Sequence, residues 1–148
     1  MKNFELLAPA GNFGKLKTAF YYGADAVYVG GRIFSLRALS ENFTAEELKE
    51  AVIYAHKRNK KLYVAVNILA KNADFDALGE YLTYLKEINV DAVIVSDPGI
   101  ISLIKQLNID LEIHLSTQAS TLNKYSAKFW VEMGVKRIVL ARELSLKE

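Results

Sequence analysis

His114 is the residue of this sequence best suited to acid–base chemistry. It lies in the stretch Glu112-Ile113-His114-Leu115-Ser116, where polar and apolar residues alternate as in a β-strand. Ile113 and Leu115 need an apolar environment, so the polar residues between them must share the opposite face. An imidazole whose ordinary pKa is about 6.5 can exchange protons near neutral pH. Two interpretations stay open: a catalytic acid or base, or a buried histidine satisfied by a hydrogen bond.

Further residues with binding chemistry follow the predicted strands at their carboxyl ends, where barrel enzymes hold their functional groups. Hydroxyl and amide side chains can hydrogen-bond a substrate, paired glycines allow close backbone approach, and arginines suit phosphate or carboxylate. Each has an ordinary alternative, because loops satisfy their own backbone, turns need glycine, and exposed arginines are common. The residues expected to bind substrate are Gly30, Gly31, Arg32, Asn67, Ser116, Thr117, Gln118, Arg142 and Glu143, and Arg37 suits the same anionic ligand.

Two acidic residues near these positions are expected to be structural. Glu112 should lie one layer deeper than His114 and pair with a basic group such as Arg137 or Lys61. Asp97 precedes Pro98, and an acid followed by proline is a typical start of a helix.

The composition excludes several functional classes. The chain has no cysteine, which rules out a disulfide, a thiolate nucleophile or an iron–sulfur site made by its own residues. Its 19 basic and 17 acidic residues give no bulk charge that calls for nucleic acid or membrane. The chain has no dinucleotide-binding, Walker, zinc-protease or hydrolase-elbow motif, and two separated histidines make no metal site. A signal peptide and a membrane span are also missing, so we expect a soluble cytoplasmic protein.

The elements that position these residues repeat as a strand followed by an amphipathic helix. Apolar strands are predicted at residues 4–8, 26–29, 61–68, 92–95, 112–120 and 137–141. Helices are predicted to follow Asn12, Thr44, Asp74, Asp97 and Asn123, and a sixth to begin at Leu144. Tyr63 and Asn67 should point inward from the third strand.

This alternation predicts an α/β fold: an incomplete TIM-barrel-like repeat of about six parallel strands and five to six helices. A whole barrel needs eight strands and roughly 250 residues. We therefore expect residues 1–148 to be a single domain, the amino-terminal part of a longer barrel protein. The alternative is that a partner chain supplies the missing strands.

Several motifs resemble the peptidase U32 family, and they occur in order along essentially the whole chain. The segments that carry the resemblance are 5–11 (ELLAPAG), 23–31 (GADAVYVGG), 42–44 (NFT), 114–118 (HLSTQ) and 139–145 (VLARELS).

The resemblance implies the amino-terminal region of a longer protein whose activity differs between family members. The family was named for collagenase-like peptidases, whereas other members hydroxylate a tRNA wobble uridine or an rRNA cytidine, and some act in ubiquinone hydroxylation. Family cysteines, which hold an iron–sulfur cluster in some members, fall beyond Glu148. We therefore expect no cofactor within this chain, and RNA or a small anionic molecule as substrate of the longer protein. The alternative is a non-catalytic binding or assembly module that forms homo-oligomers through its open barrel edges.

Overall fold

Strands and helices alternate along the chain in the computed structural model, which describes residues 4–35, 42–145 and 147. In this part of the chain six strands form one parallel sheet, and each strand pairs with the next in sequence. The strands are β1 (Leu7–Pro9), β2 (Ala26–Gly30), β3 (Lys61–Val66), β4 (Ala92–Val95), β5 (Ile113–Leu115) and β6 (Arg137–Ile138). The predicted six parallel strands are confirmed, although several are shorter than expected.

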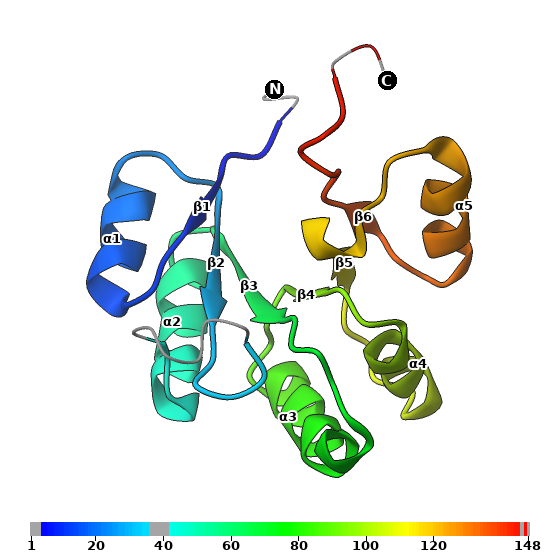
Figure 1. Cartoon of the computed structure of the whole chain (residues 1–148). Coiled ribbons are helices and arrows are strands. Elements are labelled where there is room, and N and C mark those ends of the chain that lie inside the picture. Colours follow the sequence, from blue (N-terminus) through cyan, green and yellow to red (C-terminus); the bar gives the residue numbers. More distant parts are fainter. Residues whose placement is uncertain (1–3, 36–41, 146, 148) are drawn as a thin grey trace.

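Five α-helices cover the outer face of this curved sheet (Figure 1). They are α1 (Phe13–Tyr21), α2 (Ala45–His56), α3 (Phe75–Glu87), α4 (Pro98–Gln106) and α5 (Lys124–Glu132), with 3₁₀ turns at Asn72–Asp74 and Thr117–Ala119. A sixth helix was expected from Leu144, but Leu144 and Ser145 are not helical, and residues 146 and 148 lie outside the described residues. No helix in the described ranges is both long and apolar enough to cross a membrane.

Helices begin where side chains replace missing backbone partners. The Thr44 hydroxyl accepts a hydrogen bond from the Glu47 amide, and the Glu47 carboxylate accepts one from the Thr44 amide. The Asp97 carboxylate accepts from the amide of Gly99 at 2.7 Å, just after Pro98. The predicted structural role of Asp97 is confirmed.

Short left-handed turns return the chain from helix to sheet after each of the five α-helices, and Asn59 and Asn108 have φ angles of 53° and 52° there. Gly23, Asn89 and Gly134 have φ angles of 97°, 62° and 92°. Glycine adopts this conformation freely, and asparagine tolerates it better than most residues. Each turn is followed by an apolar strand, which explains the internal repeat in the sequence.

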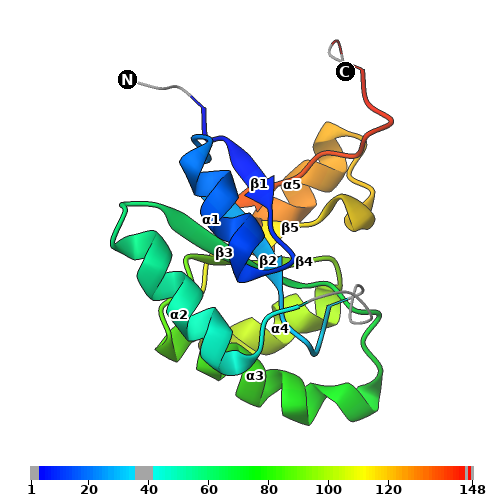
Figure 2. The same cartoon turned by 90° about the vertical axis from the view of Figure 1, so that its left-hand side faces the viewer.

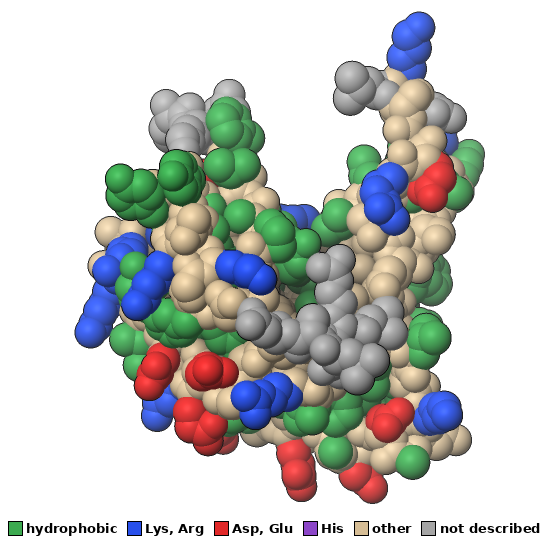
Figure 3. Space-filling view, turned by 60° about the vertical axis from the view of Figure 1, so that its left-hand side comes forward, with side chains coloured by type: hydrophobic (Ala, Val, Ile, Leu, Met, Phe, Trp, Pro, Cys, Tyr) green, Lys and Arg blue, Asp and Glu red, His purple; other side chains and the backbone are tan. Residues whose placement is uncertain are grey.

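The sheet curves into a half barrel that remains open along one side. Figure 1 shows the two ends of the chain on this open side, next to β1 and β6. Figure 2 shows α1 and α2 together over the first strands. A notch at the top of the space-filling view marks the same opening (Figure 3). Side chains on the concave face of the sheet therefore line the interior of an incomplete barrel.

Candidate functional site at the centre of the half barrel

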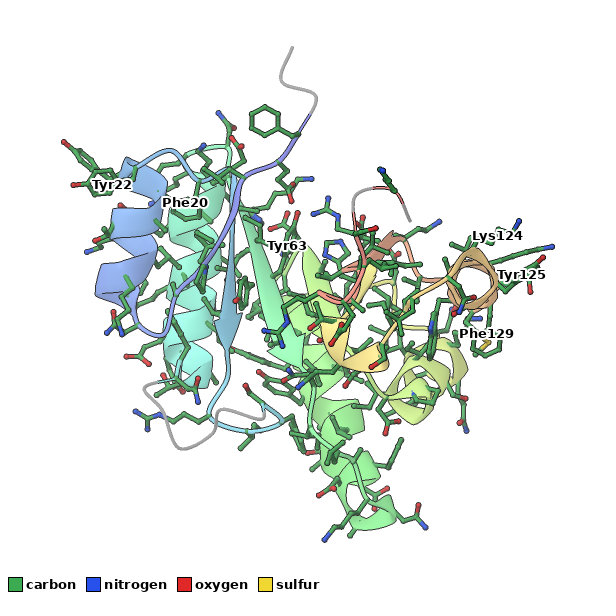
Figure 4. The ribbon with its side chains drawn as sticks, turned by 45° about the horizontal axis from the view of Figure 1, so that its top comes forward. Phe20, Tyr22, Tyr63, Lys124, Tyr125 and Phe129 are labelled. Atoms are coloured by element: carbon green, nitrogen blue, oxygen red, sulfur yellow. The ribbon has the colours of Figure 1, made fainter. Side chains whose placement is uncertain are left out.

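A cluster of charged and polar residues lies inside the half barrel, near the ends where the strands begin. The Tyr63 hydroxyl donates to both oxygens of the Glu5 carboxylate at 2.9 Å, and Arg137 Nη1 donates to the same carboxylate. Lys61 Nζ lies 3.7 Å from Glu5 Oε2. Figure 4 shows Tyr63 in the opening between the two ends of the sheet.

This cluster corrects the expected partner of Glu112. Arg137 and Lys61 both contact Glu5, whereas Glu112 Oε1 lies 2.8 Å from Nε2 of His114. The physical reason is the curvature of the sheet, which brings Glu5, just before β1, across the interior to the first residue of β6. Glu112 is 49% exposed at the rim, so it can reach the histidine two residues along its own strand.

His114 is almost completely buried, with 1% of its surface exposed. Its ring lies edge-on to the Tyr63 ring, with the two centroids 4.6 Å apart. Burial lowers the pKa of His114, and the hydrogen bond to Glu112 offsets this only in part. The ring is therefore neutral at pH 7, with its Nε2 proton donated to Glu112. This satisfies a buried histidine, and a catalytic role for it stays a prediction.

A second polar group forms at the carboxyl ends of β3 and β5. Asn67 Nδ2 donates to Gln118 Oε1 at 2.8 Å, and the Ser116 hydroxyl lies 3.4 Å from the same oxygen. Ser116 also caps the 3₁₀ turn that contains Thr117 and Gln118. Residues far apart in the sequence, all of them predicted from it to bind substrate, are thus brought together at the expected edge of the sheet.

The two glycines at the end of β2, Gly30 in the strand and Gly31 just after it, lie close to side chains inside the protein. A Cβ atom on Gly31 would lie 2.2 Å from the Tyr81 hydroxyl. One on Gly30 would lie 2.8 Å from Asn42 Oδ1 and 2.9 Å from Ser35 Oγ. At Gly31 the separation is too short for a real side chain, so an internal contact is sufficient to explain the glycine, whereas at Gly30 the Asn42 and Ser35 side chains could shift.

Three further predicted binding residues lie on the surface. Arg32, Arg142 and Glu143 are exposed, and their side chains make no hydrogen bond or ion pair with other described residues. Arg37 lies outside the described residues.

Sequence reasoning missed Glu5 as a member of the interior cluster. Its only signal was a charged residue within the predicted apolar strand at residues 4–8. The iron–sulfur cluster implied by the family resemblance does not fit this chain. The sequence has no cysteine, and the described residues include no group of three or more His, Cys, Asp or Glu placed to hold a metal ion.

The polar groups present favour hydrogen-bond recognition. The side-chain partner of the Ser116 hydroxyl is the Gln118 carboxamide, which is too weak a base to activate a nucleophile. Paired carboxamides can instead bind the planar edge of a ligand such as a nucleobase. The fold and these groups define a (β/α) half barrel with a polar cluster at the carboxyl ends of its strands.

The chain belongs to peptidase family U32. The model of this family matches residues 11–148. The chain is 49% identical over 99% of its length to tRNA hydroxylation protein P1 of Bacillus subtilis (strain 168), and 37% identical over 97% to 23S rRNA 5-hydroxycytidine C2501 synthase of Escherichia coli (strain K12). The chain spans 35% of the first protein and 21% of the second. The solved U32 peptidase Mk0906 has the same fold, with a TM-score of 0.75 at 18% identity over 95% of this chain and 60% of that one.

Proposed function

We propose that this chain is the amino-terminal half barrel of an RNA-hydroxylating enzyme. The supporting observation is the 49% identity to tRNA hydroxylation protein P1 over 99% of the chain. At that identity the chain and the relative share one fold, including the concave face. In this proposal the chain is part of a longer protein that has the activity named for the relative. That longer protein would work in the cytoplasm.

In this proposal Asn67 and Gln118 hold the base that is modified. Their side chains lie at the carboxyl ends of β3 and β5, and Gln118 is exposed there. The Gln118 Nε2 amide group makes no hydrogen bond with the described residues, so it can donate to a base carbonyl. His114 and Tyr63 lie buried in the interior of the half barrel.

Peptidase activity, suggested by the family name, is the second candidate. It would need an activated nucleophile or a metal-bound water. The Ser116 hydroxyl contacts Gln118 rather than His114, and Nε2 of His114 is bonded to Glu112. The observed hydrogen bonds therefore favour base recognition over peptide hydrolysis.

The test uses the full-length protein in a bacterial strain that lacks its own tRNA hydroxylation protein P. Total tRNA and rRNA are digested, and nucleosides carrying one added oxygen atom are measured by mass spectrometry. We expect the modified nucleoside to return with the wild-type protein and to fall strongly with the variant Gln118→Ala. The control is Glu50→Gln, an exposed residue of α2 on the outside of the barrel.

The proposal would be refuted if the protein were expressed and folded but the modified nucleoside did not return. A gain of peptide hydrolysis that depends on Ser116 would replace it with the peptidase alternative. An assembly module remains the third alternative, because β1 and β6 each pair on one side only within the described residues. Light scattering of the full-length protein would detect the oligomer that this alternative requires.

A further inference from the structure

A groove on the outer surface, between α1 and α2, combines exposed aromatic rings with basic groups. We call it the tyrosine groove, and it has a volume of about 430 Å³. Its lining residues are Lys17, Thr18, Tyr21, Tyr22 and Tyr54. Both helices that form the groove are present and pack against each other, so its exposure does not come from the open side of the half barrel.

Two of the tyrosines present their rings to solvent. Tyr21 is 85% exposed and Tyr22 79% exposed, with their ring centroids 5.3 Å apart in an edge-on arrangement. They end α1, and Gly23 then turns the chain with a φ of 97°. Figure 4 shows Tyr22 pointing away from α1. Large aromatic rings placed this way on a rigid helix end are available for stacking.

The third tyrosine, Tyr54, is held in place, and two basic side chains lie over its ring. The Tyr54 ring packs against Phe13 and Phe20, with centroids 5.5 Å and 6.4 Å away. The Arg58 guanidinium lies 3.6 Å from the Tyr54 ring centroid, and Lys17 Nζ lies 5.7 Å from it. The base of the groove is therefore fixed, with two cations placed over its aromatic ring.

These cations are available to an anion. Neither Lys17 nor Arg58 forms an ion pair with a carboxylate among the described residues, and the lining has no acidic residue. Glu50, one turn before Tyr54 on α2, is the acidic residue closest along that helix face. In Figure 3 the basic and hydrophobic side chains lie together on the left, and the acidic ones gather below them.

We propose that the tyrosine groove binds a single-stranded or looped segment of RNA. Phosphates would contact Lys17 and Arg58, and unstacked bases would stack on Tyr21 and Tyr22. The inference rests on the proposed function for the identity of the polymer, but it concerns a different surface. The groove lies where α1 and α2 end, near the amino ends of the strands, whereas Asn67 and Gln118 lie at the carboxyl ends. It anchors the RNA and does not touch the reacting base.

The test measures binding of fluorescently labelled bulk bacterial tRNA to the full-length protein by filter retention. The double variant Tyr21→Ala/Tyr22→Ala is expected to bind about tenfold more weakly or worse, because each lost stacking contact is large. Tyr21→Phe/Tyr22→Phe keeps both ring faces and should bind within about threefold of wild type. Lys17→Ala should lower the slope of log affinity against log salt by about one.

The matched control has the same residue types at another place. Lys124 Nζ lies 5.2 Å from the Tyr125 ring centroid on α5, and Tyr125 is 74% exposed. Figure 4 shows this pair on the opposite side of the molecule. Lys124→Ala/Tyr125→Ala should leave the affinity for tRNA unchanged. An equal loss in both double variants would overturn the proposal, because it would show unspecific attraction by exposed aromatic and basic residues.

The remaining outcomes also decide the matter. Unchanged affinity in Tyr21→Ala/Tyr22→Ala would overturn the tyrosine groove as an RNA site. If that variant altered the oligomeric state instead, the groove would be a protein contact. Specific tRNA binding through the groove by a protein that adds no oxygen to RNA would refute the proposed function alone. If the wild-type protein hydroxylates RNA but Tyr21→Ala/Tyr22→Ala binds tRNA as tightly as wild type does, only the proposed role of the tyrosine groove would be refuted.

Discussion

Glu5 and Arg137, 132 residues apart in the sequence, are joined by a hydrogen bond across the interior of the half barrel. Glu5 precedes the first strand and Arg137 begins the sixth, so this contact ties the two ends of the sheet together. Tyr63, from the middle of the sheet, donates to the same carboxylate at 2.9 Å. The three side chains form a clasp that limits how far the open side of the barrel can widen.

The clasp predicts a stability loss in the variant Glu5→Gln. Burial raises the pKa of Glu5, but hydrogen bonds from Arg137 and Tyr63 and the charges of Arg137 and Lys61 outweigh it, so the pKa lies below its ordinary value. We expect a loss of about 1–2 kcal/mol at pH 7, after allowing for the partial exposure of Arg137. Urea unfolding measures it, with Glu50→Gln as the exposed control.

The same clasp predicts how that difference depends on pH. A carboxylate with a lowered pKa stabilises the folded state above the pKa of the unfolded chain, about 4.3, and loses this effect as the pH falls through the folded-state value. Wild type and Glu5→Gln should therefore converge in stability below about pH 4. A difference that stayed constant down to about pH 3 would assign the loss to packing and not to the charge of Glu5.

His114 predicts a second loss of stability on acidification, at a higher pH than that of Glu5. Its folded-state pKa lies below the ordinary value, chiefly because of burial, so the unfolded chain binds a proton first as the pH falls. The stabilisation is complete above about pH 6.5 and decreases below it. The groups that face the ring are Glu112, Tyr63, Arg137 and Glu5. The variant His114→Gln, compared with His56→Gln on the surface, should lose stability less steeply between about pH 7 and 5 than wild type does.

A separate measurement on His114 concerns activity. In the full-length protein, His114→Ala should reduce RNA hydroxylation far more than it reduces the free energy of unfolding, if the ring takes part in the reaction. Equal losses of activity and stability would make His114 a core residue. The hydrogen bond to Glu112 at 2.8 Å provides a second check, because Glu112→Gln keeps the ring in place and changes only the charge beside it.

The sequence predicted the fold through periodicity and caps, which are local properties. Thr44, Asp97 and the left-handed turn at Asn89 can be read from residue type and spacing, because each acts within a few residues of itself. The Asn67–Gln118 contact was predicted only as a shared edge of the sheet. Once parallel strands are assumed, their carboxyl ends must lie together, but the contact itself depends on the side-chain conformations.

Contacts across the interior were beyond sequence reasoning. The curvature of the sheet brings together Glu5, Tyr63 and Arg137. The degree of this curvature cannot be predicted from a local sequence pattern. For that reason Glu112 was expected to pair with Arg137 or Lys61. Gly31 shows the same limit. From the sequence, a glycine at this position could be required by a bound ligand or by a side chain packed against it. The structure supplies the neighbour, the Tyr81 hydroxyl on α3.

The Asn67–Gln118 pair predicts that recognition can be separated from structure. Gln118→Glu keeps the oxygen that accepts from Asn67 Nδ2, so the contact at 2.8 Å should survive and stability should change by less than about 0.5 kcal/mol. The variant loses the Nε2 amide donor, and we expect hydroxylation by the full-length protein to fall by at least about tenfold. Unchanged hydroxylation would remove Gln118 from the set of base-binding residues.

Gly31 and Tyr81 predict a coupled pair in a double-mutant cycle. Gly31→Ala places a Cβ atom 2.2 Å from the Tyr81 hydroxyl and should destabilise the protein by about 1–3 kcal/mol. The Tyr81 hydroxyl is buried and has no hydrogen-bond partner among the described residues, so Tyr81→Phe alone should cost little or stabilise.

Combining the two changes removes the clash with the hydroxyl but leaves the ring carbon Cζ 3.2 Å from the new Cβ. The double variant should therefore recover part of the loss, with a coupling energy of at least about 0.5 kcal/mol. Thermal unfolding of the four proteins in the cycle measures it. Strict additivity would mean that Tyr81 does not set the need for glycine at this position, and a ligand contact at Gly31 would then regain its place as the explanation.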